Sequence, residues 1–356
     1  QGQDEDNKYW FPCVDHPREK VTSEIRATVD KPYVVVSNGE LKEKYEDDDG
    51  RLVYHWSMEQ PHSIYLISLA IGAYIELIDH FEDIPLSFYV PEGREEEGYR
   101  SFEKTADIVR YFSEKTGIRY PYRQYSQVVA QDFIFGGMEN TTATTLTEMT
   151  LHDERAHLDF TSEHLVAHEL AHQWFGDLVT SKSWSHSWLH EGFATYFDLL
   201  YTEHVEGEDE FFYRLLENRE TYFEEHDSKY RRSIVTNVYS QPIDLFDMHL
   251  DPGSAARLHM LRRILGEEEW WEVITLFLNE HRDSVVETVD FARCIEEVTG
   301  DNYDWFFDQW FYKPGFPVLE CSCEYQEKEK NLIFQVKQNQ SPEKGPHTFR
   351  FPLTVR

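Results

Sequence analysis

The spacing of apolar residues divides the chain into three parts. Up to about residue 83, short runs such as RLVYHWSME at 51–59 alternate between apolar and polar residues, which is typical of half-buried strands. From about residue 99, apolar residues recur three and four positions apart, and the segment 99–118 predicts one helix with a C-cap at Gly117. After Gly315 the alternation returns. The pattern predicts an α+β multidomain chain with β structure at both ends and a mostly helical centre.

Several shorter segments carry their own expectations. The run SIYLISLAIGAYIELI at 63–78 is rich in β-branched and aromatic residues and predicts one or two buried strands. The acidic segment EKYEDDDG at 43–50 predicts a turn. Further strands are expected at 31–39, 125–133, 318–326, 331–338 and 347–355.

Composition and charge restrict the class of protein. The 356 residues are 40% hydrophobic and 15% aromatic, which fits an ordered globular chain. The net charge of −33 predicts no nucleic-acid partner, because a strongly acidic surface repels polyanions. No run of about 18 apolar residues occurs, so we expect a soluble chain, with the cytoplasm as the favoured compartment. Because the chain begins with Gln1 rather than Met, we expect a trimmed amino terminus.

The four cysteines are few and irregularly spaced. Cys13, Cys294, Cys321 and Cys323 therefore predict neither a disulfide framework nor a cysteine zinc site. Cys321 and Cys323 would lie on the same face of one strand, which is poor geometry for a disulfide between them.

The segment HELAH at 168–172 places two histidines four positions apart in a helical pattern. His168 and His172 would project from the same face one turn apart, and such a pair can hold one zinc ion through ring nitrogens. Glu169 is rotated by about 100° around the helix, so it is poorly placed as a ligand but well placed as a general base. The alternative is an ordinary helix with chance histidines, because the motif is short.

A catalytic zinc site normally has three protein ligands, so a third residue is required. Glu191 opens a second apolar helical pattern after His172, and an antiparallel helix there can bring its carboxylate back over the first helix. We therefore expect one zinc ion per chain, held by His168, His172 and Glu191. Three further histidines are interpreted as surface or supporting residues, namely His164, His186 and His190.

The sequence resembles the gluzincin aminopeptidases, the family of aminopeptidase N and leukotriene hydrolase. HELAHQWFGDLVT at 168–180 and WLHEGFATY at 188–196 carry this resemblance at the predicted zinc site. GGMEN at 136–140 is similar to the exopeptidase signature of that family. YWFPCVDHPREKVTSEI at 9–25 is similar to its amino-terminal β domain, and WFYKPGFPVLE at 310–320 to the junction after its catalytic domain.

The resemblance implies roles for individual residues. His168, His172 and Glu191 resemble the zinc ligands, and Glu169 resembles the general base that activates water. Glu139 holds the position of the glutamate that binds the free α-amine of the substrate, which restricts cleavage to the first peptide bond. The expected substrate-binding residues are Gln3, Gly136, Gly137, Met138, Glu139 and Asn140.

The resemblance also implies a domain organisation. A partial amino-terminal β domain is expected at 1–83, a thermolysin-like catalytic domain at 84–315, and the start of a carboxy-terminal β-sandwich at 316–356. The first half of the amino-terminal domain and the helical carboxy-terminal domain of that family are expected to be absent, so the chain resembles a member trimmed at both ends.

One position departs from the family pattern. A tyrosine of that family donates a hydrogen bond to the oxyanion of the tetrahedral intermediate, and counting back from Met260 places Asp251 at this position. An ionised aspartate only accepts hydrogen bonds, and loss of one oxyanion donor costs about a hundred- to a thousandfold in rate. Asp251, Pro252 and Gly253 are also typical of a turn rather than of a helix start. Nothing in the sequence assigns the missing role to Tyr239.

Two hypotheses about function follow. The leading hypothesis is a zinc aminopeptidase that removes single residues from peptides with a free amino terminus. The alternative, which Asp251 motivates, is a zinc-binding but catalytically impaired member of the family that binds peptides or a partner protein. No residue specifically indicates an epoxide-opening activity. An endopeptidase is disfavoured, because it would have no use for the amine-binding role that the resemblance gives to the GGMEN segment.

Overall fold

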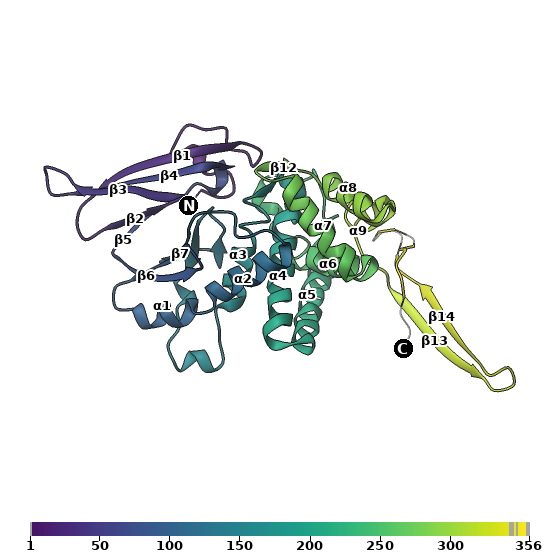
Figure 1. The fold of residues 1–356 in the computed structure, drawn as a ribbon. Coiled ribbons are helices and arrows are strands. Elements are labelled where there is room, and N and C mark those ends of the chain that lie inside the picture. Colours follow the sequence, from purple (N-terminus) through teal and green to yellow (C-terminus); the bar gives the residue numbers. More distant parts are fainter. Residues whose placement is uncertain (1, 342–344, 347, 354–356) are drawn as a thin grey trace.

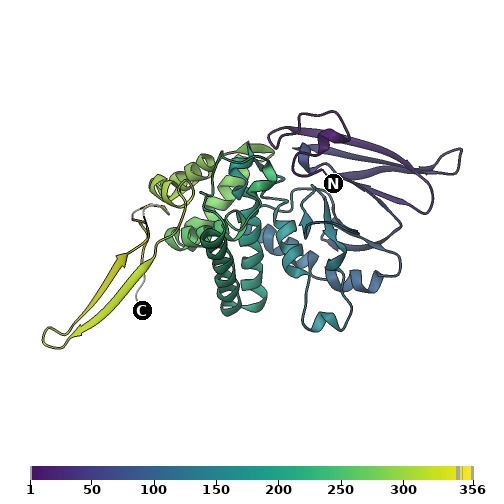
Figure 2. The same ribbon diagram turned by 180° about the vertical axis from the view of Figure 1, so that it is seen from behind.

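The computed structural model of the protein describes residues 2–341, 345–346 and 348–353. Figure 1 shows an elongated molecule with β sheets at one end, a helical body in the middle and a two-stranded hairpin at the other end, and Figure 2 shows the same arrangement from behind. The expected α+β fold with strands at both ends and helices in the centre is confirmed.

Two antiparallel sheets form the amino-terminal end. One has the order β1 (Lys20–Val29), β4 (Leu52–Ser63) and β3 (Glu40–Glu46), and the other pairs β2 (Val34–Ser37) with β5 (Leu69–Gly72). Tyr54 and Trp56 of β4 are buried together with Val35 and Val36 of β2. This shared apolar cluster holds the two sheets against each other.

Two expectations for this region are corrected. β3 extends through Glu46, so only residues 47–50 form the expected acidic turn; β3 is an edge strand, and its charged side chains stay in solvent. The segment 63–78 is a buried 3-10 turn at Ile64–Leu66, followed by β5 and β6 (Tyr74–Phe81), whose side chains are mostly exposed or half-buried. Both strands lie at sheet edges, and an edge strand needs no second buried face.

A five-stranded mixed sheet connects this end to the helices. Its order is β6, β7 (Ile84–Pro91), β8 (Tyr125–Ala130), β10 (Ala143–Thr147) and β9 (Gly137–Met138). β7, β8 and β10 run parallel, and the outer strands β6 and β9 run antiparallel to their neighbours. The expected domain boundary at residue 83 falls in the turn between β6 and β7 and stays a prediction.

The central body is built from α-helices around one large apolar core. They are α1 (Glu95–Phe102), α2 (Thr105–Thr116), α3 (Glu163–Ala171), α4 (Trp188–Glu206), α5 (Glu208–Ser228), α6 (Asp251–Leu265), α7 (Glu267–Glu280), α8 (Thr288–Thr299) and α9 (Asp304–Trp310). The single helix expected at 99–118 is two helices, α1 and α2. The break precedes Thr105, whose hydroxyl accepts a hydrogen bond from Gln127 of β8. Gly117 ends α2 with φ +69°, as expected.

The hairpin of β13 (Leu319–Gln326) and β14 (Asn331–Gln338) projects from the helical body (Figure 1). Cys321 and Cys323 are exposed and unpaired on β13. Residues 348–353 form no strand, so the third strand expected at 347–355 is wrong there; residues 347, 354 and 355 lie outside the described part of the chain. Within the described ranges, no helix has the length and apolar character needed to cross a membrane.

Candidate metal centre and substrate site

The predicted metal ligands come from two packed helices. α3 carries His168, His172 forms the carboxyl-terminal cap of α3, and Glu191 lies in the first turn of α4. Phe175, just after α3, stacks on Phe193 of α4 with ring centroids 4.4 Å apart. This contact and the surrounding core fix the distance between the two helices.

Three donor atoms converge between α3 and α4. His168 Nε2 lies 3.2 Å from His172 Nε2 and 3.4 Å from Glu191 Oε2. His172 Nε2 lies 3.5 Å from the same carboxylate oxygen. Donor atoms held at about 2.1 Å by a tetrahedral zinc ion are separated from each other by roughly 3.4 Å. The three side chains therefore fit a zinc ion without rearrangement.

A hydrogen bond determines which nitrogen of His172 faces this point. His172 Nδ1 lies 3.0 Å from the carbonyl oxygen of Phe175, which can only accept, so Nδ1 carries the proton. In the neutral ring, Nε2 then has a free lone pair toward Glu191 and His168. That lone pair is available to a metal ion; without one, Nε2 takes up a proton that the Glu191 carboxylate stabilises.

The charges around the three donors also favour a cation. Burial raises the pKa of Glu191, but the adjacent His172 and His168 outweigh this effect and lower the pKa well below its usual range. Burial lowers the pKa of His172, but the carboxylates of Glu191 and Glu139 outweigh it and raise the pKa. The carboxylates therefore stabilise positive charge at this place in the molecule.

Glu169 faces the same space from α3. Its ligand oxygen, that of Glu139 and a nitrogen of His172 lie within 4.8 Å of one another. Burial raises the pKa of Glu169 to about 7, a value suited to taking up and releasing a proton near neutral pH. A Cβ atom at Gly137 would overlap the Glu169 carboxylate, so a larger residue there would require the Glu169 side chain to move.

Glu139 follows β9 and is only 6% exposed. Its Oε1 accepts a hydrogen bond from the Tyr65 hydroxyl at 3.0 Å. Burial raises the pKa of Glu139, and the nearby His172 opposes this. A buried carboxylate is stable as an anion only beside donors or a cation, so this position suits a substrate ammonium group.

The remaining residues of the GGMEN segment lie in β9 or next to it. β9 is an edge strand, and an edge strand can pair with an extended peptide. Met138 is buried in one apolar cluster with Tyr65 and Trp184. The Asn140 side chain donates to the Leu66 carbonyl at 3.3 Å and accepts from the Thr145 hydroxyl at 2.9 Å. A Cβ atom at Gly136 would lie 3.2 Å from the Leu165 side chain.

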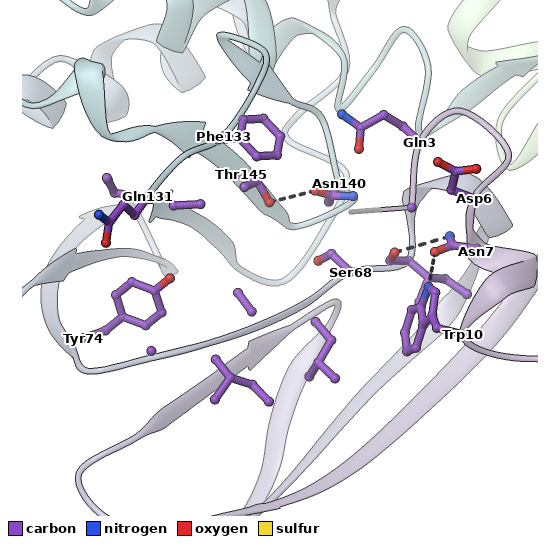
Figure 3. Close-up of a pocket in the computed structure, with 18 of the residues that line it drawn as sticks. Gln3, Asp6, Asn7, Trp10, Ser68, Tyr74, Gln131, Phe133, Asn140 and Thr145 are labelled. Atoms are coloured by element: carbon purple, nitrogen blue, oxygen red, sulfur yellow. Dashed lines mark hydrogen bonds between the residues drawn. The ribbon is translucent and has the colours of Figure 1, made fainter. Parts of the chain in front are cut away.

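Gln3 lies on the wall of a cavity of about 960 Å³ between the amino-terminal segment and residues 67–74. Figure 3 shows Gln3 on the same side of this cavity as Asn140, whose bond to Thr145 is drawn. Of the described residues that line the cavity, none is a predicted zinc ligand. A contact between Gln3 and a substrate amine stays a prediction.

Asp251 is the first residue of α6, so the turn expected at this position is wrong. Pro252 lies in the first helical turn, where a missing N–H breaks no helix hydrogen bond, and an acidic residue there is favoured by the helix dipole. Asp251 Oδ1 is buried without a hydrogen-bond partner among the described residues. Burial, and next the charge of Glu191, raise the pKa of Asp251 well above its usual range. α6 packs against α4, the helix that carries Glu191.

The sequence did not identify two residues near Glu139. Tyr65 contacts Glu139, and His190 contacts Tyr65. The sequence predicts a buried strand for the segment that contains Tyr65, and it predicts a surface or supporting role for His190. His190 Nε2 accepts a hydrogen bond from the backbone N–H of Ser181 at 2.6 Å, and His190 Nδ1 lies 3.4 Å from the Tyr65 hydroxyl. No local pattern marks these residues, because the contacts join positions 65, 139 and 190.

The other two histidines have partners away from the metal centre. His164 Nδ1 lies 3.0 Å from Asp198 Oδ1, and His186 Nδ1 lies 2.8 Å from the Thr288 hydroxyl. These contacts agree with the interpretation of both histidines as surface or supporting residues.

Comparison with known proteins adds two family matches. Residues 100–310 match the Peptidase family M1 domain, and residues 1–66 match the Peptidase M1 N-terminal domain. The first match covers both helices of the metal centre and the GGMEN segment.

Curated relatives from archaea and plants are similar along most of the chain. The chain is 30% identical to "Probable aminopeptidase 2" of Sulfurisphaera tokodaii, over 88% of the chain and 41% of that relative. It is 28% identical to "Aminopeptidase M1" of Arabidopsis thaliana, over 89% of the chain and 37% of that relative. It is also 28% identical to "Leucyl aminopeptidase" of Saccharolobus solfataricus, over 88% of the chain and 40% of that relative. The chain thus spans roughly two fifths of the length of these relatives.

Proposed function

The chain belongs to the M1 peptidase family, that of the gluzincin aminopeptidases, and from this premise we propose that it is a zinc aminopeptidase that releases the amino-terminal residue of peptides. The observation that carries the proposal is the convergence of His168, His172 and Glu191 within 3.2–3.5 Å of one another beside two buried glutamates. The names of three relatives as aminopeptidases support the same class of reaction.

In the proposed reaction, His168, His172 and Glu191 would hold zinc. Bound zinc would supply Lewis acidity, which polarises a peptide carbonyl and lowers the pKa of water. Glu169 takes a proton from the attacking water and passes it to the nitrogen of the leaving peptide. Glu139 binds the α-ammonium group, so that only the first peptide bond is brought into register. The products are one free amino acid and the shortened peptide.

A second candidate function is zinc-dependent peptide binding with little turnover. The observation that favours it is the buried carboxyl of Asp251 at the start of α6, where the resemblance implies a tyrosine hydroxyl. Burial raises the pKa of Asp251 and favours its neutral form, so this carboxyl offers an oxyanion at most one hydrogen bond in place of the tyrosine. The names of the relatives indicate no such impairment. We therefore rank this candidate below the active aminopeptidase.

The experiment that tests both candidates measures fluorophore release from a panel of aminoacyl-coumarin substrates and the zinc content of the same sample. One zinc per chain with turnover above background supports the aminopeptidase. Full zinc occupancy without turnover supports the second candidate, and Asp251→Tyr should then restore turnover. A chain that binds no zinc and cleaves no substrate would contradict both.

A further inference from the structure

A series of hydrogen-bonded groups, the hydrogen-bond relay, leads from β11 (Val179–Ser181) through His190 and Tyr65 to Glu139. It begins at the backbone N–H of Ser181 in β11, which donates to His190 Nε2 at 2.6 Å. His190 Nδ1 lies 3.4 Å from the Tyr65 hydroxyl oxygen, a longer and weaker contact than a usual N–H···O hydrogen bond. The Tyr65 hydroxyl lies 3.0 Å from Glu139 Oε1.

The chemistry of the first donor fixes the direction of the whole hydrogen-bond relay. A backbone N–H can only donate, so His190 Nε2 is unprotonated and the single ring proton lies on Nδ1. This Nδ1–H then faces the Tyr65 oxygen as a donor. The Tyr65 hydroxyl accepts from His190 and gives its own proton to Glu139, so every proton in the hydrogen-bond relay points toward the Glu139 carboxylate.

The surrounding residues shield the hydrogen-bond relay from water and hold its side chains in place. Tyr65 is 2% exposed, His190 1% and Glu139 6%, so water does not compete strongly for these groups. The Tyr65 ring packs edge-on against Trp184 with centroids 5.0 Å apart and lies parallel to the His190 ring. A hydrogen bond to a buried ionised group is stronger than one in water, because the local dielectric constant is low.

We propose that Tyr65, oriented by His190, is a positioning residue that holds Glu139 as an ionised acceptor for the α-ammonium group of the substrate; this inference rests on the proposed function of Glu139. A carboxylate has about four lone-pair sites, so one bond from Tyr65 leaves acceptor capacity for the ammonium. Tyr65 itself contacts Glu139 and not the reacting atoms. Its loss therefore weakens recognition of the amine and leaves the zinc ligands in place.

The test variant is Tyr65→Phe, which keeps the ring against Trp184 and removes only the hydroxyl. Its matched control is Tyr111→Phe, which also removes one buried hydroxyl, in this case bonded to the Leu200 carbonyl at 2.8 Å. Two zinc-chelating probes, L-leucine hydroxamate and 4-methylpentanohydroxamate, differ only in the α-amine. Calorimetry gives the affinity of each probe for each zinc-loaded protein, and the ratio of the two affinities measures recognition of the amine.

We expect Tyr65→Phe to lower this ratio roughly tenfold or more, the usual effect of losing a hydrogen bond to a charged group. We also expect KM for aminoacyl-coumarins to rise by a similar factor with kcat within about threefold, because the lost interaction is made in both ground and transition states. Tyr111→Phe should leave the ratio, KM and zinc content unchanged. A merely structural role for Tyr65 would instead weaken both probes equally.

Three outcomes are decisive. An unchanged ratio in a folded, zinc-loaded Tyr65→Phe protein overturns the inference, as does a fall in kcat alone. A wild-type protein without turnover contradicts the proposed function, but the ratio of probe affinities still decides the role of Tyr65. If Tyr65→Phe does not fold, His190→Gln replaces it, and an unchanged ratio in that variant likewise overturns the inference.

Discussion

Glu169 lies one residue after the first predicted zinc ligand, and this residue is 5% exposed. A glutamate in water has a pKa of about 4.3 and is a weak base at neutral pH. Burial raises the pKa of Glu169 to about 7. At the scale of one residue, the helix therefore supplies the position of this carboxylate, and burial supplies its basicity.

We expect Glu169→Gln to lower kcat by about a hundred- to ten-thousandfold, because glutamine cannot accept the proton of the attacking water. Zinc content should stay at one per chain, because the three converging donors do not include Glu169. Steady-state kinetics and metal analysis on one sample check both values. Glu163→Gln, on the same helix, is the control and should turn over normally. A Glu169→Gln protein with wild-type kcat would remove Glu169 from the mechanism.

At the scale of elements, one glycine sets the distance between α4 and α6. A Cβ atom at Gly192 would lie 2.5 Å from the Ser254 Cβ, closer than side-chain carbons approach in folded proteins. Gly192 follows the predicted ligand Glu191, and Ser254 lies in the first turn of α6, three residues after Asp251. A change in the distance between these helices would therefore also move Glu191 in the predicted metal centre.

We expect Gly192→Ala to lower the free energy of unfolding by about 1–3 kcal/mol, because the added methyl group pushes α6 away from α4. Zinc affinity should fall as well, because Glu191 moves with its helix. Urea denaturation and a zinc titration measure the two effects. In the double variant Gly192→Ala, Ser254→Gly, the colliding Cβ atom is gone, and most of both losses should be recovered. No recovery would show that the collision is not the cause.

A buried ion pair ties the segment after α5 to the start of α6. Arg232 donates to both carboxylate oxygens of Asp247, at 2.7 and 2.5 Å, and the backbone N–H groups of His249 and Leu250 donate to the same carboxylate. Burial raises the pKa of Asp247, but the hydrogen bonds from His249 and Arg232 outweigh it and lower the pKa well below its usual range.

The sign of the pH effect follows from this lowered pKa. The unfolded chain takes up a proton at Asp247 near pH 4, whereas the folded chain keeps the carboxylate ionised to a lower pH. The stabilisation is therefore fully present above about pH 4 and is lost as the pH falls toward the folded-state pKa.

We expect Asp247→Asn to lower the free energy of unfolding by about 3 kcal/mol at pH 7, because Arg232 is left buried without its anion. The difference from wild type should shrink at pH 3. Urea denaturation at both pH values, with a chelator in all samples, gives this difference. Asp308→Asn, in the exposed pair with Lys313, is the control and should change stability by less than about 0.5 kcal/mol. A difference that is independent of pH would contradict the assignment.

At the scale of the whole molecule, the proposed zinc ion joins two helices of the central core. His168 and His172 come from the end of α3 and Glu191 from the start of α4, so the metal closes a contact between separate elements. A ligand that binds only the folded state adds stability in proportion to the logarithm of its concentration.

We expect removal of zinc to lower the free energy of unfolding by about 4 kcal/mol relative to zinc at a thousandfold excess over its dissociation constant. Thermal melting with and without a chelator, followed by zinc addition, measures the loss and its recovery. A His168→Ala variant lacks one donor and should respond far less to either treatment. If neither the chelator nor added zinc changes the melting temperature of the wild-type protein, the proposed site is contradicted.

Many features of this protein were predictable because they depend on neighbours in the sequence. The alternation at 318–326 and 331–338 predicted β13 and β14, and Gly117 predicted the end of α2. The i, i+4 spacing of His168 and His172 places both rings on one face of any helix. Their role as zinc ligands, like that of Glu191, stays a prediction supported by the geometry.

Other features were decided only by the tertiary structure, because they depend on contacts between distant positions. Local composition predicted buried strands at 63–78, but β5 and β6 are edge strands with mostly exposed or half-buried side chains, and the turn that carries Tyr65 is buried. Asp251 is typical of a turn in the sequence, but it is the first residue of α6, which packs against the helix that carries Glu191. The sequence by itself determined the order of β and helical parts, several individual elements and the spacing of the candidate ligands. The fold decided burial, and burial sets the pKa of Glu169 and brings Tyr65 to Glu139.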